Sequence, residues 1–219
     1  MPPLPAMLLP ELQAYCERLQ LLGEGGLAER HLDASHQVKS WIHGRLLQGL
    51  PAELIVVCTG NSRRSILGST LGNVAAAFGG HGAVRFYSGG TAPSAFNLRT
   101  IRTLREIGTQ IEEQGELAPS GTSGEANPCY SVRWGATATS RAIEFSKRYD
   151  DATNPQQDYC AIMVCTDADE NCPVVLGASV RVSMPFDDPQ EFDGEPTEPA
   201  AYAERRDQIG RVMLRLFDH

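Results

Sequence analysis

The residues from Cys58 to Ser65 combine a nucleophile with groups that bind anions. They read CTGNSRRS, they follow the apolar run ELIVV, and the helical pattern ILGSTLGNVAAAF comes directly after them. A cysteine six residues before an arginine means little by itself, but a preceding strand, a glycine for the turn and a following helix make it informative. Such a loop turns successive backbone N–H groups inward, and the helix N-terminus completes a concave anion site. The expected oxyanion-binding residues are Thr59, Gly60, Asn61, Ser62, Arg63, Arg64 and Ser65.

The side chains of this loop also suit attack on the bound oxyanion. Arg64 offers a planar fork that matches two oxygens of a tetrahedral oxyanion. The same positive field favours the thiolate form of Cys58, which makes it a nucleophile near neutral pH. Ser65 can hydrogen-bond that thiolate, and Asn61 can hold the loop in a left-handed backbone conformation. The alternative is a buried cysteine followed by two surface arginines at a helix start.

The pattern Cys58-x5-Arg64-Ser65 after a first strand resembles the low-molecular-weight protein tyrosine phosphatase superfamily. That superfamily includes the thioredoxin-coupled arsenate reductases, whose loop reads much like CTGNS-x-RS. The resemblance covers about residues 53–115 and 158–219, and it implies Cys58 as nucleophile and Arg64 as oxyanion ligand. Arg63 is a departure, because many members have a second cysteine there. It makes the loop more cationic and can lie at its rim.

A proton donor for the leaving group is expected late in the chain, because the chemistry needs one. The stretch SMPFDDPQEFDG ends a predicted strand, and the superfamily's general acid is the aspartate directly before the proline of such a turn. The resemblance therefore implies Asp188, with Pro189 fixing the turn and Asp187 as a neighbour that faces solvent or stabilises the loop. The alternative is a polar turn without a catalytic role. Phosphatase members often place two aromatic residues after this proline, whereas Gln190 and Glu191 stand here.

Two further cysteines, Cys165 and Cys172, stand in the stretch VCTDADENCP, which resembles the redox segment of thioredoxin-coupled arsenate reductases. The resemblance implies a thiol relay. Cys58 attacks arsenate, Cys165 releases arsenite by forming a disulfide with Cys58, and Cys172 moves the disulfide to Cys165. The small polar residues 166–171 are expected to form a flexible loop. The alternative is a buried strand-terminal cysteine and a loop cysteine that never exchange.

The same stretch matches no metal site. Its cysteine spacing is too long for a paired zinc motif and further ligands are missing, and DADEN lacks the glycine and glutamate of a calcium loop. We therefore expect no metal and no cofactor, apart from an external thioredoxin-type reductant if the protein is a reductase. The remaining cysteines, Cys16, Cys129 and Cys160, are expected to be structural.

The elements that must hold these residues alternate between strands and helices. Apolar runs predict strands at 53–58, 83–90, 160–165 and 180–185, and helical spacing predicts helices at 8–22, 27–48, 65–78, 96–108 and 199–217. The expected fold class is α/β, a three-layer sandwich of the phosphatase I type with a parallel sheet of about four strands. In such sheets the ligand site lies beyond the carboxyl ends of the strands, where Cys58 and Cys165 stand.

Two segments lie outside that core pattern. Residues 1–50 are expected to form a helical extension that covers a sheet face or edge or mediates association, and residues 51–219 to form the phosphatase-like catalytic domain. Residues 117–158 are predicted to be an irregular insertion, in which CYSVRW and AIEFS alternate with the period of a β-hairpin. That hairpin could cover the site and select a substrate.

Composition limits the partners and the compartment. The chain has 219 residues and a net charge of −8, so nucleic acids and anionic membranes are not expected as partners. The start MPPLPAMLLPEL lacks the basic segment of a signal peptide, and we expect a cytoplasmic protein with reduced thiols. The oligomeric state is left open between a monomer and a homodimer formed through the N-terminal helices.

Three functions remain possible from the sequence. The first is an arsenate reductase that uses Cys58, Cys165 and Cys172. The second is a low-molecular-weight phosphatase that hydrolyses phosphotyrosine or small phosphomonoesters through a phosphocysteine at Cys58. The third is a non-enzymatic redox sensor or oxyanion-binding protein, against which the presence of Arg64 and Asp188 argues. The cysteine pair favours the reductase.

Overall fold

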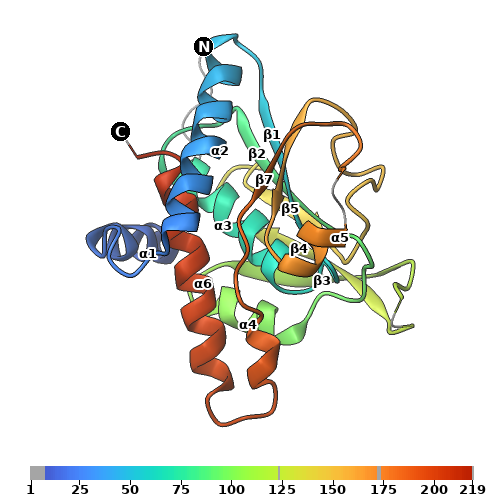
Figure 1. The fold of residues 1–219 in the computed structure, drawn as a ribbon. Helices are drawn as coiled ribbons and strands as arrows, with labels where there is room; N and C mark the ends of the chain where they lie inside the picture. The colour runs from blue at the N-terminus through green and yellow to red at the C-terminus, as the bar shows by residue number, and fades with distance from the viewer. Residues whose placement is uncertain (1–7, 123, 172–173, 219) are drawn as a thin grey trace.

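The computed structural model describes residues 8–122, 124–171 and 174–218, and its centre is a parallel sheet (Figure 1). Its strands are β1 (Ala52–Cys58), β2 (Val84–Gly90), β6 (Tyr159–Met163) and β7 (Ala178–Ser183), in the order β2-β1-β6-β7. All neighbouring strands in this sheet run parallel. Every residue of β6 is buried, as expected for a central strand covered on both faces. The predicted α/β fold with a four-stranded parallel sheet and flanking helices is confirmed.

The helix α3 (Arg64–Phe78) packs directly on β1 and β2 and carries the second half of the Cys58 loop. Two glycines permit this close approach. A Cβ on Gly68 would lie 2.7 Å from a methyl of Val56, and one on Gly72 would lie 2.6 Å from the ring of Phe86. The helix α6 (Glu198–Arg215) packs on α3, and α4 (Leu98–Arg105) packs on α6. The start of α3 is thereby fixed relative to the end of β1.

The N-terminal helices α1 (Pro10–Leu21) and α2 (Glu29–Leu47) belong to the same packed body. The helix α1 contacts α3 and α6, whereas α2 contacts α6 and the strands β1 and β7. Their buried side chains join the main hydrophobic core, namely Leu12, Tyr15, Cys16, Leu19, Ala34, Val38 and Ile42. Only α2 of this extension packs against strands of the sheet, whereas α1 packs against helices. Within the described part of the chain, no helix combines the length and apolarity needed to cross a membrane.

A second, antiparallel sheet follows α4 and lies with α5 on the other side of the molecule from α2 and α6 (Figure 1). It consists of β3 (Gln110–Ala118), β4 (Asn127–Arg133) and β5 (Arg141–Glu144), in that order. The pairing of β4 with β5 confirms the predicted hairpin. The strand β3 was not predicted, because only Ile111 of its nine residues is buried and no apolar alternation marks it.

The segment after β6 differs from the sequence-based expectation. Residues 166–171, predicted to be a flexible loop, form the short helix α5 (Thr166–Asn171). The N–H of Asp169 donates to the carbonyl of Cys165 at 3.0 Å, and acidic side chains in a first turn interact favourably with the helix dipole. The salt bridge from Arg181 of β7 to Asp169, at 2.6 Å, holds this helix to the sheet. The prediction of a loop is therefore wrong.

Candidate functional site

The oxyanion loop, defined here as residues 59–65, runs from the end of β1 to the first turn of α3. Asn61 has φ of 42°, so the predicted left-handed conformation is present. The end of β2 leaves room for this turn, since a Cβ on Gly90 would lie 2.6 Å from the carbonyl oxygen of Thr59. Among the described residues, no acceptor receives the backbone N–H groups of residues 60–63. The loop therefore offers a set of backbone donors suited to an anion.

The sulfur of Cys58 lies inside this loop, and the side chain is 4% exposed. Its Sγ is 3.1 Å from the hydroxyl oxygen of Ser65. The amide nitrogen of Asn61 donates to that same hydroxyl at 2.9 Å. Because the Ser65 oxygen already accepts from Asn61, its own proton can point to the sulfur. This arrangement directs a hydrogen-bond donor at the sulfur of Cys58.

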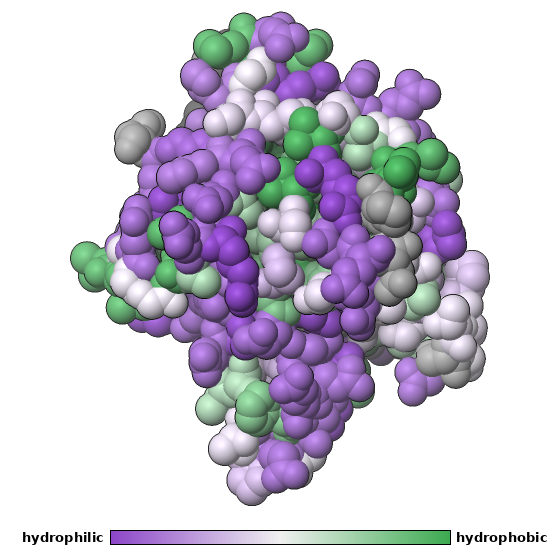
Figure 2. Space-filling model, viewed as in Figure 1, coloured by the Kyte–Doolittle hydropathy of each residue, from purple (hydrophilic) through white to green (hydrophobic). Residues whose placement is uncertain are grey.

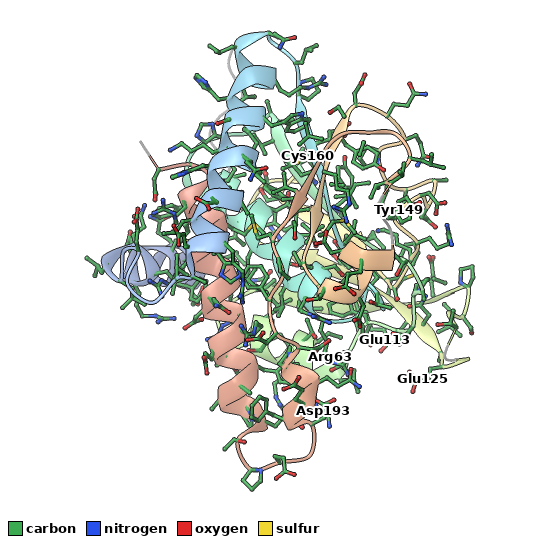
Figure 3. The ribbon with its side chains drawn as sticks, in the orientation of Figure 1. Arg63, Glu113, Glu125, Tyr149, Cys160 and Asp193 are labelled. Atoms are coloured by element: carbon green, nitrogen blue, oxygen red, sulfur yellow. The ribbon has the colours of Figure 1, made fainter. Side chains whose placement is uncertain are left out.

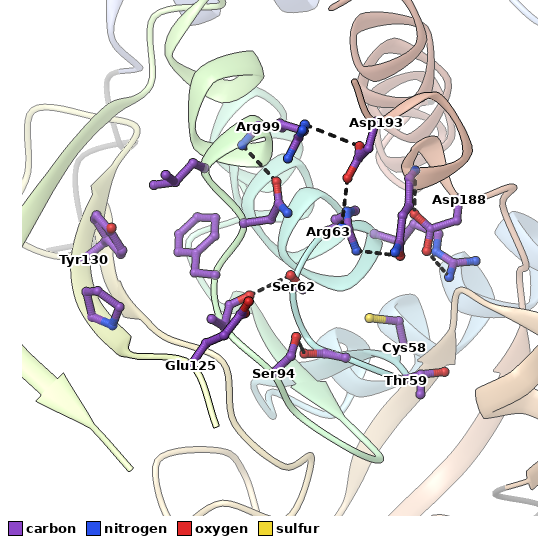
Figure 4. Close-up of a pocket in the computed structure, with 18 of the residues that line it drawn as sticks. Cys58, Thr59, Ser62, Arg63, Ser94, Arg99, Glu125, Tyr130, Asp188 and Asp193 are labelled. Carbon is purple, nitrogen blue, oxygen red and sulfur yellow. Dashed lines mark hydrogen bonds and ion pairs between the residues drawn. The ribbon is translucent and has the colours of Figure 1, made fainter. Parts of the chain in front are cut away.

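Arg64 and Asp188 meet at the mouth of the loop (Figure 4). One terminal nitrogen of Arg64 donates to the carboxylate of Asp188 at 2.5 Å, and the other donates to the carbonyl of Phe186 at 2.9 Å. The Nε of Arg64 is buried and has no hydrogen-bond partner among the described residues. The second carboxylate oxygen of Asp188 accepts from the N–H of Gln190 at 3.0 Å and caps the 3-10 helix η1 (Pro189–Phe192). The structure thus brings together the predicted oxyanion ligand and the predicted acid.

Arg63 lies beside Asp193 (Figure 3). Its guanidinium donates to the hydroxyl of Tyr202 at 2.9 Å, to the side-chain oxygen of Gln190 at 2.9 Å and to Asp193 at 3.3 Å. Those acceptors occupy the donor groups that an oxyanion would use. Arg63 therefore ties the loop to η1 and α6, which agrees with a place at the rim.

A second pair of arginines fixes the start of α6 next to the site. Arg99 and Arg102 of α4 donate to Glu198 at 2.6 and 2.7 Å. The N–H of Gly194, together with Arg102 and Arg99, lowers the pKa of Glu198 to about 2. Glu198 is therefore a permanent carboxylate that orients both arginines.

The segment after β5 supports the loop from behind. The hydroxyl of Ser146 donates to the carbonyl of Gly60 at 2.8 Å, and the N–H of Lys147 donates to the side-chain oxygen of Asn61, also at 2.8 Å. Asn127 holds Ser146 in place through bonds to its N–H and its carbonyl, at 3.0 and 2.7 Å. All four side chains in this network are buried, and Gly60 is half-buried. The sequence indicated only that a hairpin could cover the site, and gave no sign of this contact with the loop.

A cavity of about 840 Å³ opens above Cys58 (Figure 4). Its floor is the oxyanion loop, one wall is the segment 94–99 before and at the start of α4, and another wall comes from the second sheet. Glu125, Pro128 and Tyr130 contribute to that last wall, whereas Asp188, Gln190 and Asp193 close the opposite side. The surrounding surface on the face drawn is largely hydrophilic (Figure 2). The predicted hairpin therefore does line the space in which a substrate would sit.

Cys165 lies beside the oxyanion loop. It follows β6, the neighbour of β1 in the sheet, and its Sγ is 3.4 Å from the hydroxyl oxygen of Thr59. The sulfur also accepts from the N–H of Ala168 at 3.4 Å, and the side chain is 1% exposed. Cys172, the third member of the predicted relay, lies outside the described residues.

The other cysteines have surroundings that disfavour reaction. Burial raises the pKa of Cys16 and of Cys160 to about 12, and burial also raises the pKa of Cys129. A thiol with a raised pKa is a poor source of thiolate at neutral pH. These three residues thus have the properties expected of structural cysteines.

Comparison with family models and with curated protein sequences finds no match. Solved structures with a similar arrangement are found. An arsenate reductase in the phosphate-binding state is 19% identical, covers 74% of this chain and 93% of its own, and has a TM-score of 0.42. The YwlE arginine phosphatase from Geobacillus stearothermophilus is 16% identical, with 76% and 90% covered and a TM-score of 0.43. A thioredoxin-dependent arsenate reductase from Corynebacterium glutamicum is 15% identical, with 90% and 92% covered and a TM-score of 0.38.

Proposed function

We propose that this chain is a cysteine-dependent oxyanion enzyme of the low-molecular-weight protein tyrosine phosphatase superfamily. The observation that carries the proposal is the shared cavity of Cys58, Arg64 and Asp188 beside a loop whose N–H groups at residues 60–63 have no acceptor among the described residues. Nucleophile, oxyanion ligand and proton donor are the groups that displacement at a tetrahedral oxyanion requires.

The first step uses only these residues. The oxyanion binds the loop N–H groups and the fork of Arg64, for which it competes with the carboxylate of Asp188. The Cys58 thiolate attacks the central atom. Asp188 acts in its carboxylic acid form, gives its proton to the oxygen that leaves and becomes a carboxylate. The hydroxyl of Ser65, 3.1 Å from the sulfur of Cys58, keeps that sulfur in place for the attack.

Arsenate reduction is the favoured activity, because Cys165 stands at the adjacent strand end, beside the residue that follows Cys58. In this reaction Cys58 forms a sulfur–arsenic bond and water leaves. Cys165 then attacks the sulfur of Cys58, and the electron pair of the sulfur–arsenic bond passes to arsenic, which departs as arsenite. Cys172 attacks Cys165 and frees the Cys58 thiolate. An external thioredoxin-type dithiol reduces the remaining disulfide.

Hydrolysis of phosphomonoesters is the second candidate, and the size of the cavity favours it. A cavity of about 840 Å³ is in the range of pockets that hold organic ligands, and Phe96 and Tyr130 are among the residues that line it. Arsenate alone leaves most of that volume to solvent. In this reaction water hydrolyses a phosphocysteine at Cys58, and neither Cys165 nor Cys172 takes part.

One set of assays separates these activities. Thioredoxin-dependent arsenate reduction and para-nitrophenyl phosphate hydrolysis are measured side by side for the wild type and for Cys58→Ser, Cys165→Ser and Cys172→Ser. For the reductase, we expect all three variants to lose arsenate turnover, while Cys165→Ser and Cys172→Ser keep any phosphatase activity. Arsenate turnover that persists in both of these variants would exclude the relay.

Cys129→Ser is the matched control, because this thiol lies on β4 away from the loop. It is expected to leave both activities unchanged. If Cys58→Ser keeps either activity at the wild-type level, the proposed function is wrong.

A further inference from the structure

His31 of α2 is buried against the segment that carries Asp188. This acid segment, defined here as residues 184–188, connects β7 to η1. The Nε2 of His31 is 2.8 Å from the carbonyl oxygen of Pro185, so the ring carries its proton on that nitrogen and donates it. The imidazole also stacks on the ring of Phe186, with centroids 4.4 Å apart and planes inclined by 19°. His31 is 0% exposed.

The residues that His31 contacts are linked to the groups proposed to react. Phe186, which stacks on His31, accepts a hydrogen bond from Arg64 through its carbonyl. Two residues later, Asp188 pairs with the same guanidinium. The beginning of the segment is held to β6 by bonds from Met184 N–H to Met163 at 2.8 Å and from Phe186 N–H to Val164 at 3.1 Å. After Phe186, the backbone runs to the cap of η1.

The helix that supplies His31 is itself anchored. Ala34, Val38 and Ile42 place the same face of α2 in the core, where the helix contacts β1, β7 and α6. A ring held by such a helix has little freedom to move, so it can fix the position of what it touches. The sheet alone cannot do this beyond Phe186, because the described ladder with β6 ends there.

We propose that His31 is a positioning residue that holds the acid segment so that Asp188 faces Cys58. The N-terminal helix α2 is then part of the catalytic apparatus as well as a cover for the sheet. This inference rests on the proposed function, in which Asp188 protonates the leaving oxygen.

Two variants separate the hydrogen bond of His31 from its ring stack. His31→Phe keeps a stacked ring and removes the donor to Pro185, whereas His31→Gln keeps an amide donor and removes the ring stack. His43→Gln is the control, since His43 lies on the same helix and is exposed. Substrates are para-nitrophenyl phosphate, which has a good leaving group, and phenyl phosphate, which has a poor one and depends more on protonation.

For His31→Phe, we expect kcat/KM to fall about tenfold more for phenyl phosphate than for para-nitrophenyl phosphate. The inhibition constant of inorganic phosphate should stay within about twofold, because the oxyanion loop is not altered. His31→Gln should fall between the wild type and His31→Phe, and His43→Gln should match the wild type. Equal losses for the two substrates would show a merely structural role and overturn the proposal.

Hydrogen exchange gives a readout that needs no turnover. In His31→Phe, the amides of Phe186 and Gln190 should exchange about tenfold faster or more, while those of α3 keep their protection. Unchanged exchange at these two amides would also overturn the positioning role. If the wild type shows no Cys58-dependent turnover of phosphate esters or arsenate, the proposed function fails, and the exchange result still decides whether His31 holds the segment.

Discussion

Arg63 and Arg64 are neighbours in sequence with different tasks. Both terminal nitrogens of Arg64 have acceptors, the carboxylate of Asp188 and the carbonyl of Phe186, and its buried Nε has no partner among the described residues. Arg63 instead donates to Tyr202, Gln190 and Asp193. Lysine keeps the charge but loses the planar fork. The two arginines can therefore be compared directly by the same substitution.

Arg64→Lys should lower kcat/KM about 100-fold or more, because charge that develops on the oxyanion loses paired donors. Arg63→Lys should change kcat/KM by less than about tenfold and mainly lower the free energy of unfolding, since it breaks a part-buried network. Steady-state kinetics and urea denaturation measure the two effects. Equal kinetic losses in the two variants would contradict the assignment of Arg63 to the rim.

Asn61 combines backbone strain with two buried hydrogen bonds. At φ of 42°, a residue with a Cβ other than asparagine or aspartate is disfavoured by about 1 kcal/mol or more. Asn61→Gly and Asn61→Ala both lose the bonds to Lys147 and Ser65, which should lower the free energy of unfolding by about 1–3 kcal/mol. Asn61→Ala should lose more than Asn61→Gly, as measured by urea denaturation. The opposite order would mean that the loop relaxes out of its left-handed turn.

At the scale of elements, close packing of α3 on the sheet outweighs helix propensity. Alanine is favoured over glycine in a helix by about 1 kcal/mol, but a Cβ at position 72 would lie 2.6 Å from the Phe86 ring. Gly72→Ala should therefore lower the free energy of unfolding by about 1–3 kcal/mol through overpacking. Gly44→Ala in α2 is the control. A Cβ there meets nothing within 4 Å, so this variant should raise the free energy of unfolding by about 0.5–1 kcal/mol. If Gly72→Ala is also stabilising, α3 is less tightly held than described.

The sequence predicted secondary structure correctly where a hydrophobic pattern was compatible with only one type of element. The apolar runs that became β1 and β6 could hardly be anything but central strands, and their shared direction brings Cys58 and Cys165 to one edge of the sheet. The strand β3 was missed because it is nearly all exposed, and α5 because five polar residues around a single alanine carry no helical period. The roles of Tyr202 and Ser146 could not be predicted, since each depends on a partner more than 80 residues away.

At the scale of the whole molecule, stability should depend on pH through His31. Burial, with Arg30 and Arg205 nearby, lowers the pKa of His31 below its ordinary value of 6.5, against smaller opposing effects of the bond to Pro185 and of Asp187. Below pH 6.5, the unfolded chain therefore binds a proton at His31 more readily than the folded chain does. The contribution of neutral His31 to the free energy of unfolding is fully present above pH 6.5, and it is lost as pH falls toward the lowered pKa. The midpoint of thermal unfolding should fall more between pH 7 and pH 5 for the wild type than for His31→Gln. Parallel curves for the two proteins would contradict a buried neutral imidazole.

The docking of α1 on α6 has a consequence for how the chain is made. Tyr15 and Arg18 of α1 bind Asp207 of α6, and Arg211 of α6 donates to the carbonyl of Gly23 just after α1. The ribosome must add about 190 residues after α1 begins before these partners exist, which takes roughly 10–40 s at usual rates of synthesis. During that time α1 can contact α3 but lacks the partners that α6 supplies. The packing of α1 is thus complete only after α6 has been synthesised. The acid segment that α2 contacts is also among the last parts of the chain to take its position.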